Sequence, residues 1–394
     1  MRNIFVCLIL ASLVWISGMG ARSFLVAGVC LGLFVFFPVV MGDWFKRVAL
    51  PSHIGPLLAG FVIGASDLVP QGGMDSLRIY VHLGGVFLCL HVGSLLSPGV
   101  FLNQKILKAA SLVVVSTLLI ITAVLIVLWG IPALSAIHLG LICSITAPLF
   151  TLLSYPDRKE GLMVSIVTTA ISLVIVASFQ IILRAAFPLV SLSHILTYLL
   201  FLEISFRTLR QINTEHGKYL FYGATSLMLY LASERVGLSP EFLALLTGSL
   251  LRIRSGSRRI GQLDATGSTS LIPFILAFLV AATLDPVSAL KGYEWRFVLS
   301  FSLAMYLGKG LSAWFASRFL TIAPRDWLQI MPHGFFAILL LKTGLPGGFL
   351  TSSPTAVVSA SILVNSVVIS LLLPLLQFTI EKIKIRRLEA IKAL

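Results

Sequence analysis

Charge is scarce in this sequence. Asp, Glu, Lys and Arg make up 11% of its 394 residues, whereas a soluble domain has about a quarter. Hydrophobic residues make up 58%, which is more apolar surface than a water-soluble fold could cover. The low charge therefore excludes a soluble globular protein and predicts an integral membrane protein.

Cysteine is also rare. The four cysteines lie in apolar stretches without CxxC spacing, at Cys7, Cys30, Cys89 and Cys143, so the pattern predicts no disulfide framework or metal site. No nucleophile–base or metal-ligand spacing indicates an enzyme or a bound cofactor. The net charge of +14 is expected to orient the chain and to contact anionic lipids, not nucleic acid.

Long apolar runs are abundant. Most are close to the roughly twenty residues that cross a bilayer as a helix, and none has the alternation of a barrel strand. The spans at 54–66 and 239–251 are shorter, so we expect them to be tilted, extended by their flanks or buried in protein. Assigning the joints alternately to two sides gathers most of the 29 Lys and Arg residues on one side, as expected of cytoplasmic loops. The sequence predicts an all-α polytopic membrane protein of about 13–14 transmembrane helices, at 4–20, 23–41, 54–66, 79–97, 109–130, 134–153, 161–184, 189–207, 219–236, 239–251, 269–285, 296–318, 327–345 and 355–380.

The first span has two interpretations. It is either an extra helix, in which case both termini are cytoplasmic, or a cleaved signal sequence, because Arg2 precedes an apolar stretch that ends in small residues. The expected location is a bacterial inner membrane.

The two halves of the chain are similar at a fixed offset. The Leu-Leu-x-Gly of 57–60 recurs at 245–248, and the Val92-x3-Leu96-x-Pro98 pattern recurs at 280–286. By the predicted helix count the second copy crosses in the opposite direction. Inverted-topology repeats with broken helices at the midplane are typical of secondary transporters.

Two prolines interrupt corresponding apolar spans. Pro148 lies in the sixth span and Pro332 in the thirteenth, where proline removes a backbone N–H and breaks the ladder. We expect these to be crossed, interrupted helices, although a simple kink in each is the alternative.

Five segments together resemble a known family, the monovalent cation:proton antiporters or sodium/proton exchangers. In chain order they are Gly55-Pro56-Leu57-Leu58-Ala59-Gly60, Leu83-Gly84-Gly85 to Gly93, Val236-Gly237-Leu238-Ser239 to Gly248, Lys309, and Met331-Pro332-His333-Gly334. The resemblance implies a homodimer with a mobile core domain, a dimerising scaffold, and Na⁺, K⁺ or H⁺ as substrate. It also implies a first inverted repeat at 23–184, a linker helix at 185–217 and a second repeat at 218–380, between an extra helix at 1–22 and a basic cytoplasmic tail at 381–394.

The sequence departs from the family where the chemistry is expected. Family members carry Thr-Asp-Pro at the broken helix and Asn-Asp or Asp-Asp on the next helix. Here the corresponding residues are Thr146-Ala147-Pro148 and Thr168-Thr169, and His333-Gly334-Phe335 replaces Arg-Gly-Glu. Cation:proton exchange needs a group that alternates between anionic and neutral forms, a role suited to carboxylates.

The candidate ion-binding residues are therefore mainly hydroxyls with one buried cation. They are Ser144, Thr146, Ala147, Pro148, Thr168, Thr169, Ser172, Lys309 and His333. Hydroxyls and freed carbonyls can coordinate a hard cation, whereas Lys309 favours an anion. The alternative is that the Ser and Thr residues only pack helices together. The acidic residues lie in joints, helix ends or tails except Glu203, which we expect to pair with Arg207.

Three hypotheses follow. The first is a transporter of the cation:proton antiporter type with altered or lost coupling. The second is a non-transporting homologue that acts as a scaffold, sensor or subunit, and the third is a carrier of an anion or neutral solute.

Overall fold

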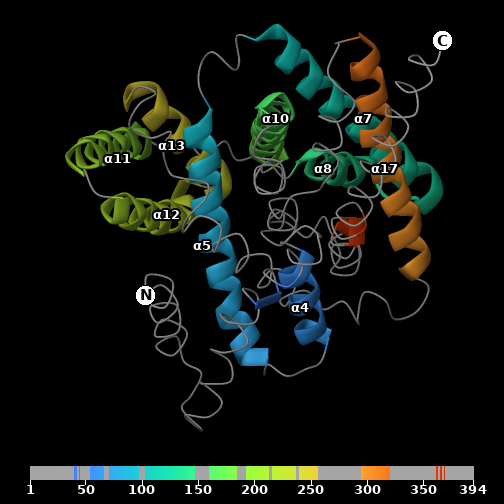
Figure 1. Cartoon of the computed structure of the whole chain (residues 1–394), viewed down its shortest axis with the longest axis horizontal. Coiled ribbons are helices and arrows are strands. Elements are labelled where there is room, and N and C mark those ends of the chain that lie inside the picture. Colours follow the sequence, from blue (N-terminus) through green and yellow to red (C-terminus); the bar gives the residue numbers. More distant parts are fainter. Residues whose placement is uncertain are drawn as a thin grey trace, which may run out of the picture.

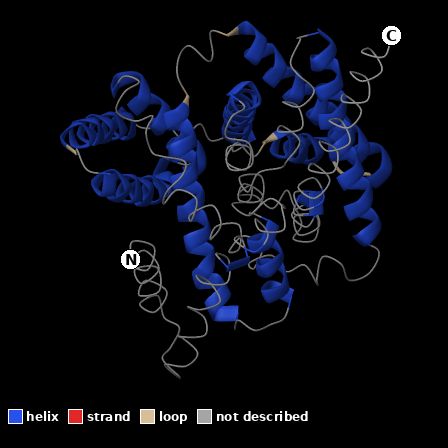
Figure 2. Cartoon of the chain, in the orientation of Figure 1, coloured by secondary structure: helices blue, strands red, loops and turns tan. Residues whose placement is uncertain are grey.

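A computed structural model describes residues 40–41, 44, 54–65, 71–96, 103–146, 159–183, 192–212, 215–236, 239–255, 294–319, 361–362, 364–365 and 368. This part of the chain is built from helices (Figure 2). In chain order they are α4 (Ile54–Ala65), α5 (Gln71–Leu95), α7 (Gln104–Trp129), α8 (Ala133–Ser144), α10 (Lys159–Leu183), α11 (Leu192–Gln211), α12 (Glu215–Val236), α13 (Pro240–Ser255) and α17 (Glu294–Phe319).

These helices coincide with nine of the predicted spans, although several begin earlier or end differently. The predicted spans at 4–20, 269–285 and 327–345 lie outside the described residues, and those at 23–41 and 355–380 are described at a few positions only. Most of the second copy of the proposed repeat lies outside the described residues, so its inverted orientation stays a prediction.

The ends of α7 follow from its sequence. The Asn103 side chain accepts hydrogen bonds from the backbone N–H groups of Lys105 and Ile106 at 3.1 and 3.4 Å, which caps the helix start. Gly130 adopts a left-handed backbone with φ of 61° and donates its N–H to the Ile126 carbonyl at 3.1 Å. Glycine is favoured there because it has no Cβ to clash.

The bilayer accounts for the outer face of this helix. Among the described residues, α7 is the one helix long and apolar enough to cross a membrane by itself; shorter apolar stretches lie at Val81–Leu95, Ala133–Ser144, Met163–Val176 and Leu220–Ser233. Its exposed side chains include Leu119, Val127 and Leu128. Lipid tails solvate such side chains, which water would not.

The helices form two groups. In Figure 1, α11, α12 and α13 lie beside α5, while α7, α8 and α17 lie together on the other side of α10. Close packing joins α13 to α5 in the first group, and α17, α8 and α10 to α7 in the second; α10 also touches α13. The groups meet at that junction.

The α5–α13 crossing depends on two glycines. A Cβ on Gly93 would overlap the Leu245 carbonyl, and one on Gly248 would overlap the Leu90 carbonyl. The backbones of the two helices are therefore in direct contact, as small residues allow in membrane helices.

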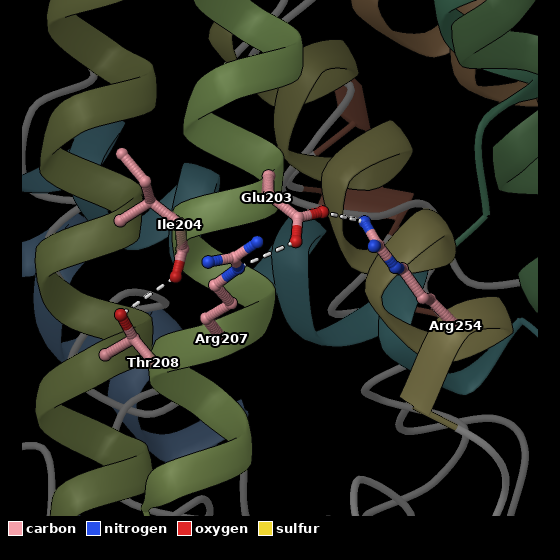
Figure 3. Close-up of polar contacts among 5 residues, drawn as sticks. All are labelled: Glu203, Ile204, Arg207, Thr208 and Arg254. Carbon is pink, nitrogen blue, oxygen red and sulfur yellow. Dashed lines mark hydrogen bonds and ion pairs between the residues drawn. The ribbon is translucent and has the colours of Figure 1, made fainter.

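An ion cluster joins α11 to α13 near their C-terminal ends. Arg207 Nε donates to Glu203 Oε1 at 2.9 Å, and Arg254 pairs with the other carboxylate oxygen (Figure 3). The expected Glu203–Arg207 pair is confirmed, and Arg254 extends it to a second helix. The C-terminal ends of α11 and α13 therefore lie on the same side.

Replacing either crossing glycine by alanine tests this packing. Gly93→Ala or Gly248→Ala should lower stability by about 1–3 kcal/mol, because the added methyl forces the backbones apart. Gly223→Ala is the control, since nothing lies within 4 Å of its added Cβ and alanine is the better helix former by about 0.5–1 kcal/mol. Thermal unfolding in detergent measures both; equal melting temperatures for the three variants would contradict the close approach.

Candidate ion-binding site

The site is built around the end of α8. The helix ends at Ser144, and Ile145 has extended backbone angles (φ −63°, ψ 131°) while its N–H still reaches the Ile142 carbonyl at 3.2 Å. The sequence predicted one span over 134–153 with its break at Pro148; the helix instead ends before that proline. The β-branched Ile145 and Thr146 favour extended backbone, and a residue preceding proline is disfavoured in a helix.

Lys309 reaches this helix end from α17. Its side chain is 2% exposed, and Nζ donates to the Ile145 carbonyl at 3.3 Å. Gly308 brings α17 close to α7, because a Cβ there would lie 3.1 Å from Thr117 Cα. The Lys309 amino group thus points into the protein and donates to the carbonyl of the residue that follows the last turn of α8.

Hydroxyl groups of α10 line the other side of the break. Thr146 Oγ1 donates to the Ser165 carbonyl at 2.7 Å and lies 3.0 Å from Thr169 Oγ1. The Thr169 hydroxyl is also 3.4 Å from the Thr146 carbonyl, to which it can donate. Ser165 Oγ donates to Thr146 Oγ1 at 2.9 Å. Three hydroxyl oxygens and two backbone carbonyls therefore meet at one buried point.

One turn further along, Ser144 and Ser172 share a hydrogen bond of 2.7 Å. The Ser144 hydroxyl also lies 2.6 Å from the Leu141 carbonyl, one of the acceptors that a helix end leaves free. This second contact continues the seam between α8 and α10.

Of the predicted site residues, the structure brings together Ser144, Thr146, Thr169, Ser172 and Lys309. Thr168 is fully buried on α10 and donates to the Val164 carbonyl of its own helix at 2.7 Å. Ala147, Pro148 and His333 lie outside the described residues.

Sequence reasoning missed two polar residues. Ser165 belongs to the hydroxyl cluster, and its signal was available: positions 165, 168, 169 and 172 follow the i, i+3, i+4, i+7 spacing of one helix face. Glu241 was assigned to a helix end, where acids are ordinarily exposed, yet its side chain is 0% exposed. No sequence pattern indicated that burial.

The cluster offers neutral oxygen ligands next to the Lys309 amino group. Hydroxyls and carbonyls suit a hard monovalent cation or the donors of a polar solute, while the Lys309 ammonium opposes a cation and attracts an anion. Within the described ranges, no group of His, Cys, Asp and Glu side chains could hold a metal ion.

Comparison with solved structures identifies the fold. The chain is similar to the sodium proton antiporter MjNhaP1 from Methanocaldococcus jannaschii at pH 8, with a TM-score of 0.67, 16% identity, and coverage of 89% of this chain and 98% of that one. An electron-microscopy structure of the same antiporter matches with a TM-score of 0.65, 14% identity, and coverage of 90% and 96%.

No protein-family model and no curated protein sequence matches the chain. The likeness to the solved structures is one of fold, and it confirms the predicted fold class: a helical membrane protein with the sodium proton antiporter fold.

Removing the Thr146 hydroxyl tests whether the cluster is structural. Thr146→Val keeps the shape but leaves the Ser165 carbonyl without this donor, so stability should fall by about 1–3 kcal/mol. Thr208→Val is the matched control, because Thr208 is exposed and donates only to the Ile204 carbonyl at 2.8 Å (Figure 3); we expect a change within about 0.5 kcal/mol. Thermal unfolding of the two purified variants compares them, and an equal effect would argue against a tightly bonded cluster.

Proposed function

We propose that this chain is a secondary transporter of the cation:proton antiporter type whose ion coupling is altered. One observation carries the proposal: the end of α8 is lined by hydroxyls, with Thr169 where the resembling family carries an aspartate, and by Lys309 where that family carries a basic residue. The name of the similar structures supports a monovalent cation as substrate.

The geometry supports binding at the break. A cation entering there would meet Thr146 and Thr169 oxygens, which lie 3.0 Å apart, together with the carbonyls that follow α8. These ligands are neutral, so they bind a cation weakly and cannot exchange it for a proton as a carboxylate does. Altered coupling therefore follows from the ligand chemistry.

Two other functions remain in competition. Lys309 favours a carrier of an anion or polar neutral solute, because its ammonium is fixed beside the break. The bonded hydroxyls equally suit a non-transporting scaffold, sensor or subunit, since they satisfy the backbone without needing a substrate. Location in a bacterial inner membrane and homodimer formation through the scaffold belong to the leading proposal.

Reconstitution separates these functions. The purified chain is placed in liposomes with a pH-sensitive dye and challenged in turn with Na⁺, K⁺, Li⁺ and common anions. A change in the dye signal when a cation is added supports the antiporter type, and a change when an anion is added supports the carrier. No change with any of these ions supports the scaffold.

Restoring the acid tests the altered coupling. Thr169→Asp places a carboxylate beside Thr146, next to the residue whose carbonyl accepts from Lys309. We expect it to create or increase proton-coupled cation flux by about tenfold or more, which corresponds to about 1.4 kcal/mol. Thr169→Asn is the matched control, because it has the same size without the charge. Equal flux through both variants would contradict a coupling role for this position.

Neutralising Lys309 distinguishes cation from anion transport. Lys309→Met keeps the length and removes the charge. If the substrate is a cation, the variant should bind it more tightly, because an opposing charge has gone; if it is an anion, flux should fall. The substrate concentration at half-maximal flux measures the change, and an unchanged value would place Lys309 outside the binding site.

A further inference from the structure

A second polar pair lies in the other helix group, away from the broken helix. Glu241 is in the first turn of α13, where Ser239 accepts the Phe242 N–H at 3.2 Å and caps the helix. Acids are favourable there because of the helix dipole, but this one is fully buried. Neither of its carboxylate oxygens has a hydrogen-bond partner among the described residues.

A basic group, His82 on α5, lies close to this carboxylate. Its Nδ1 lies 3.9 Å from Glu241 Oε1, and its side chain is 16% exposed. The ring of Tyr230 on α12 stacks against the imidazole, with 6.3 Å between centroids and 26° between planes. Three helices of the first group therefore enclose the pair.

An ionised carboxylate without hydrogen bonds is very costly to bury. The pair avoids this cost when the Glu241 carboxyl holds a proton and the neighbouring imidazole is neutral.

The other ionisable groups around the pair can be named. Cys89 on α5 lies within electrostatic range of Glu241, and Tyr230 faces His82 from α12. On α11, Tyr198 shares a hydrogen bond of 2.8 Å with Thr247 of α13. The described side chains of α10, Met163–Val176, carry no ionisable group. Arg252 and Arg254 lie at the opposite end of α13.

We propose that Glu241 and His82 form a buried proton-binding site, separate from the cluster around Lys309. The geometry carries it: a fully buried carboxylate without hydrogen bonds from the described residues, an imidazole at 3.9 Å, and walls from three helices. The site lies on α5, α12 and α13, whereas the cluster lies on α8, α10 and α17. It goes beyond the proposed transport function, because binding a proton requires no substrate at the broken helix.

Infrared difference spectroscopy on the full-length protein in lipid nanodiscs tests the site. Spectra at low and high pH should contain the carbonyl stretch of a protonated, buried carboxyl group. Glu241→Gln should remove that band, and His82→Gln should keep it but move the pH at which it is lost, because the group beside the carboxyl has changed. Glu203→Gln is the matched control, as this carboxylate is partly exposed and paired with two arginines, and it should leave the band intact.

Two results would overturn the proposal. A Glu241→Gln spectrum identical to that of the unmodified protein would show that Glu241 holds no proton, and loss of the band in Glu203→Gln would assign it elsewhere. His82→Gln keeps the test decisive if Glu241→Gln does not fold: an unchanged titration of the band would also overturn the pairing. The spectra need no flux, so silent liposomes with an intact Glu241 band would reject the transporter and retain the proton site.

Discussion

The backbone released at the end of α8 is the constraint on which the rest of the candidate site depends. In a bilayer no water can satisfy free carbonyls, so protein groups must do so. Lys309 donates to the Ile145 carbonyl. The Thr169 hydroxyl lies within reach of the Thr146 carbonyl, and the Ser144 hydroxyl lies within reach of the Leu141 carbonyl. These contacts require α10 and α17 to lie against the break, and they explain why polar side chains occur on those helices at this depth.

The same contacts show why the fold can persist without core carboxylates. A threonine hydroxyl can form hydrogen bonds with the backbone at the end of α8, as an aspartate side chain also can. Unlike the aspartate, the threonine carries no charge that changes when a proton binds. For this reason the likeness in fold does not separate a transporter from a scaffold.

The sequence predicted the helices and the polar residues around the break, because apolar length and a lysine within an apolar span are local signals. It placed the break at Pro148, since proline is the strongest local breaker; this residue lies outside the described part of the chain, and the end of α8 at Ser144 had not been predicted. It also missed Glu241. Burial of that acid depends on the packing of α5 against α13 through Gly93 and Gly248, and no local pattern shows which side chains such a crossing encloses.

The positions of the two polar centres constrain how they could influence each other. Within the first group, α5 and α13 touch at backbone distance, so His82 and Glu241 move together with little freedom to slide. The contact between α13 and α10, the helix that carries Thr169, is less extensive. Relative movement of the groups would therefore occur at that junction. Proximity alone does not establish coupling. Coupling requires a structural element that has two arrangements, and both sites must shift the balance between them. The α10–α13 junction is the contact at which such an element would act on both groups.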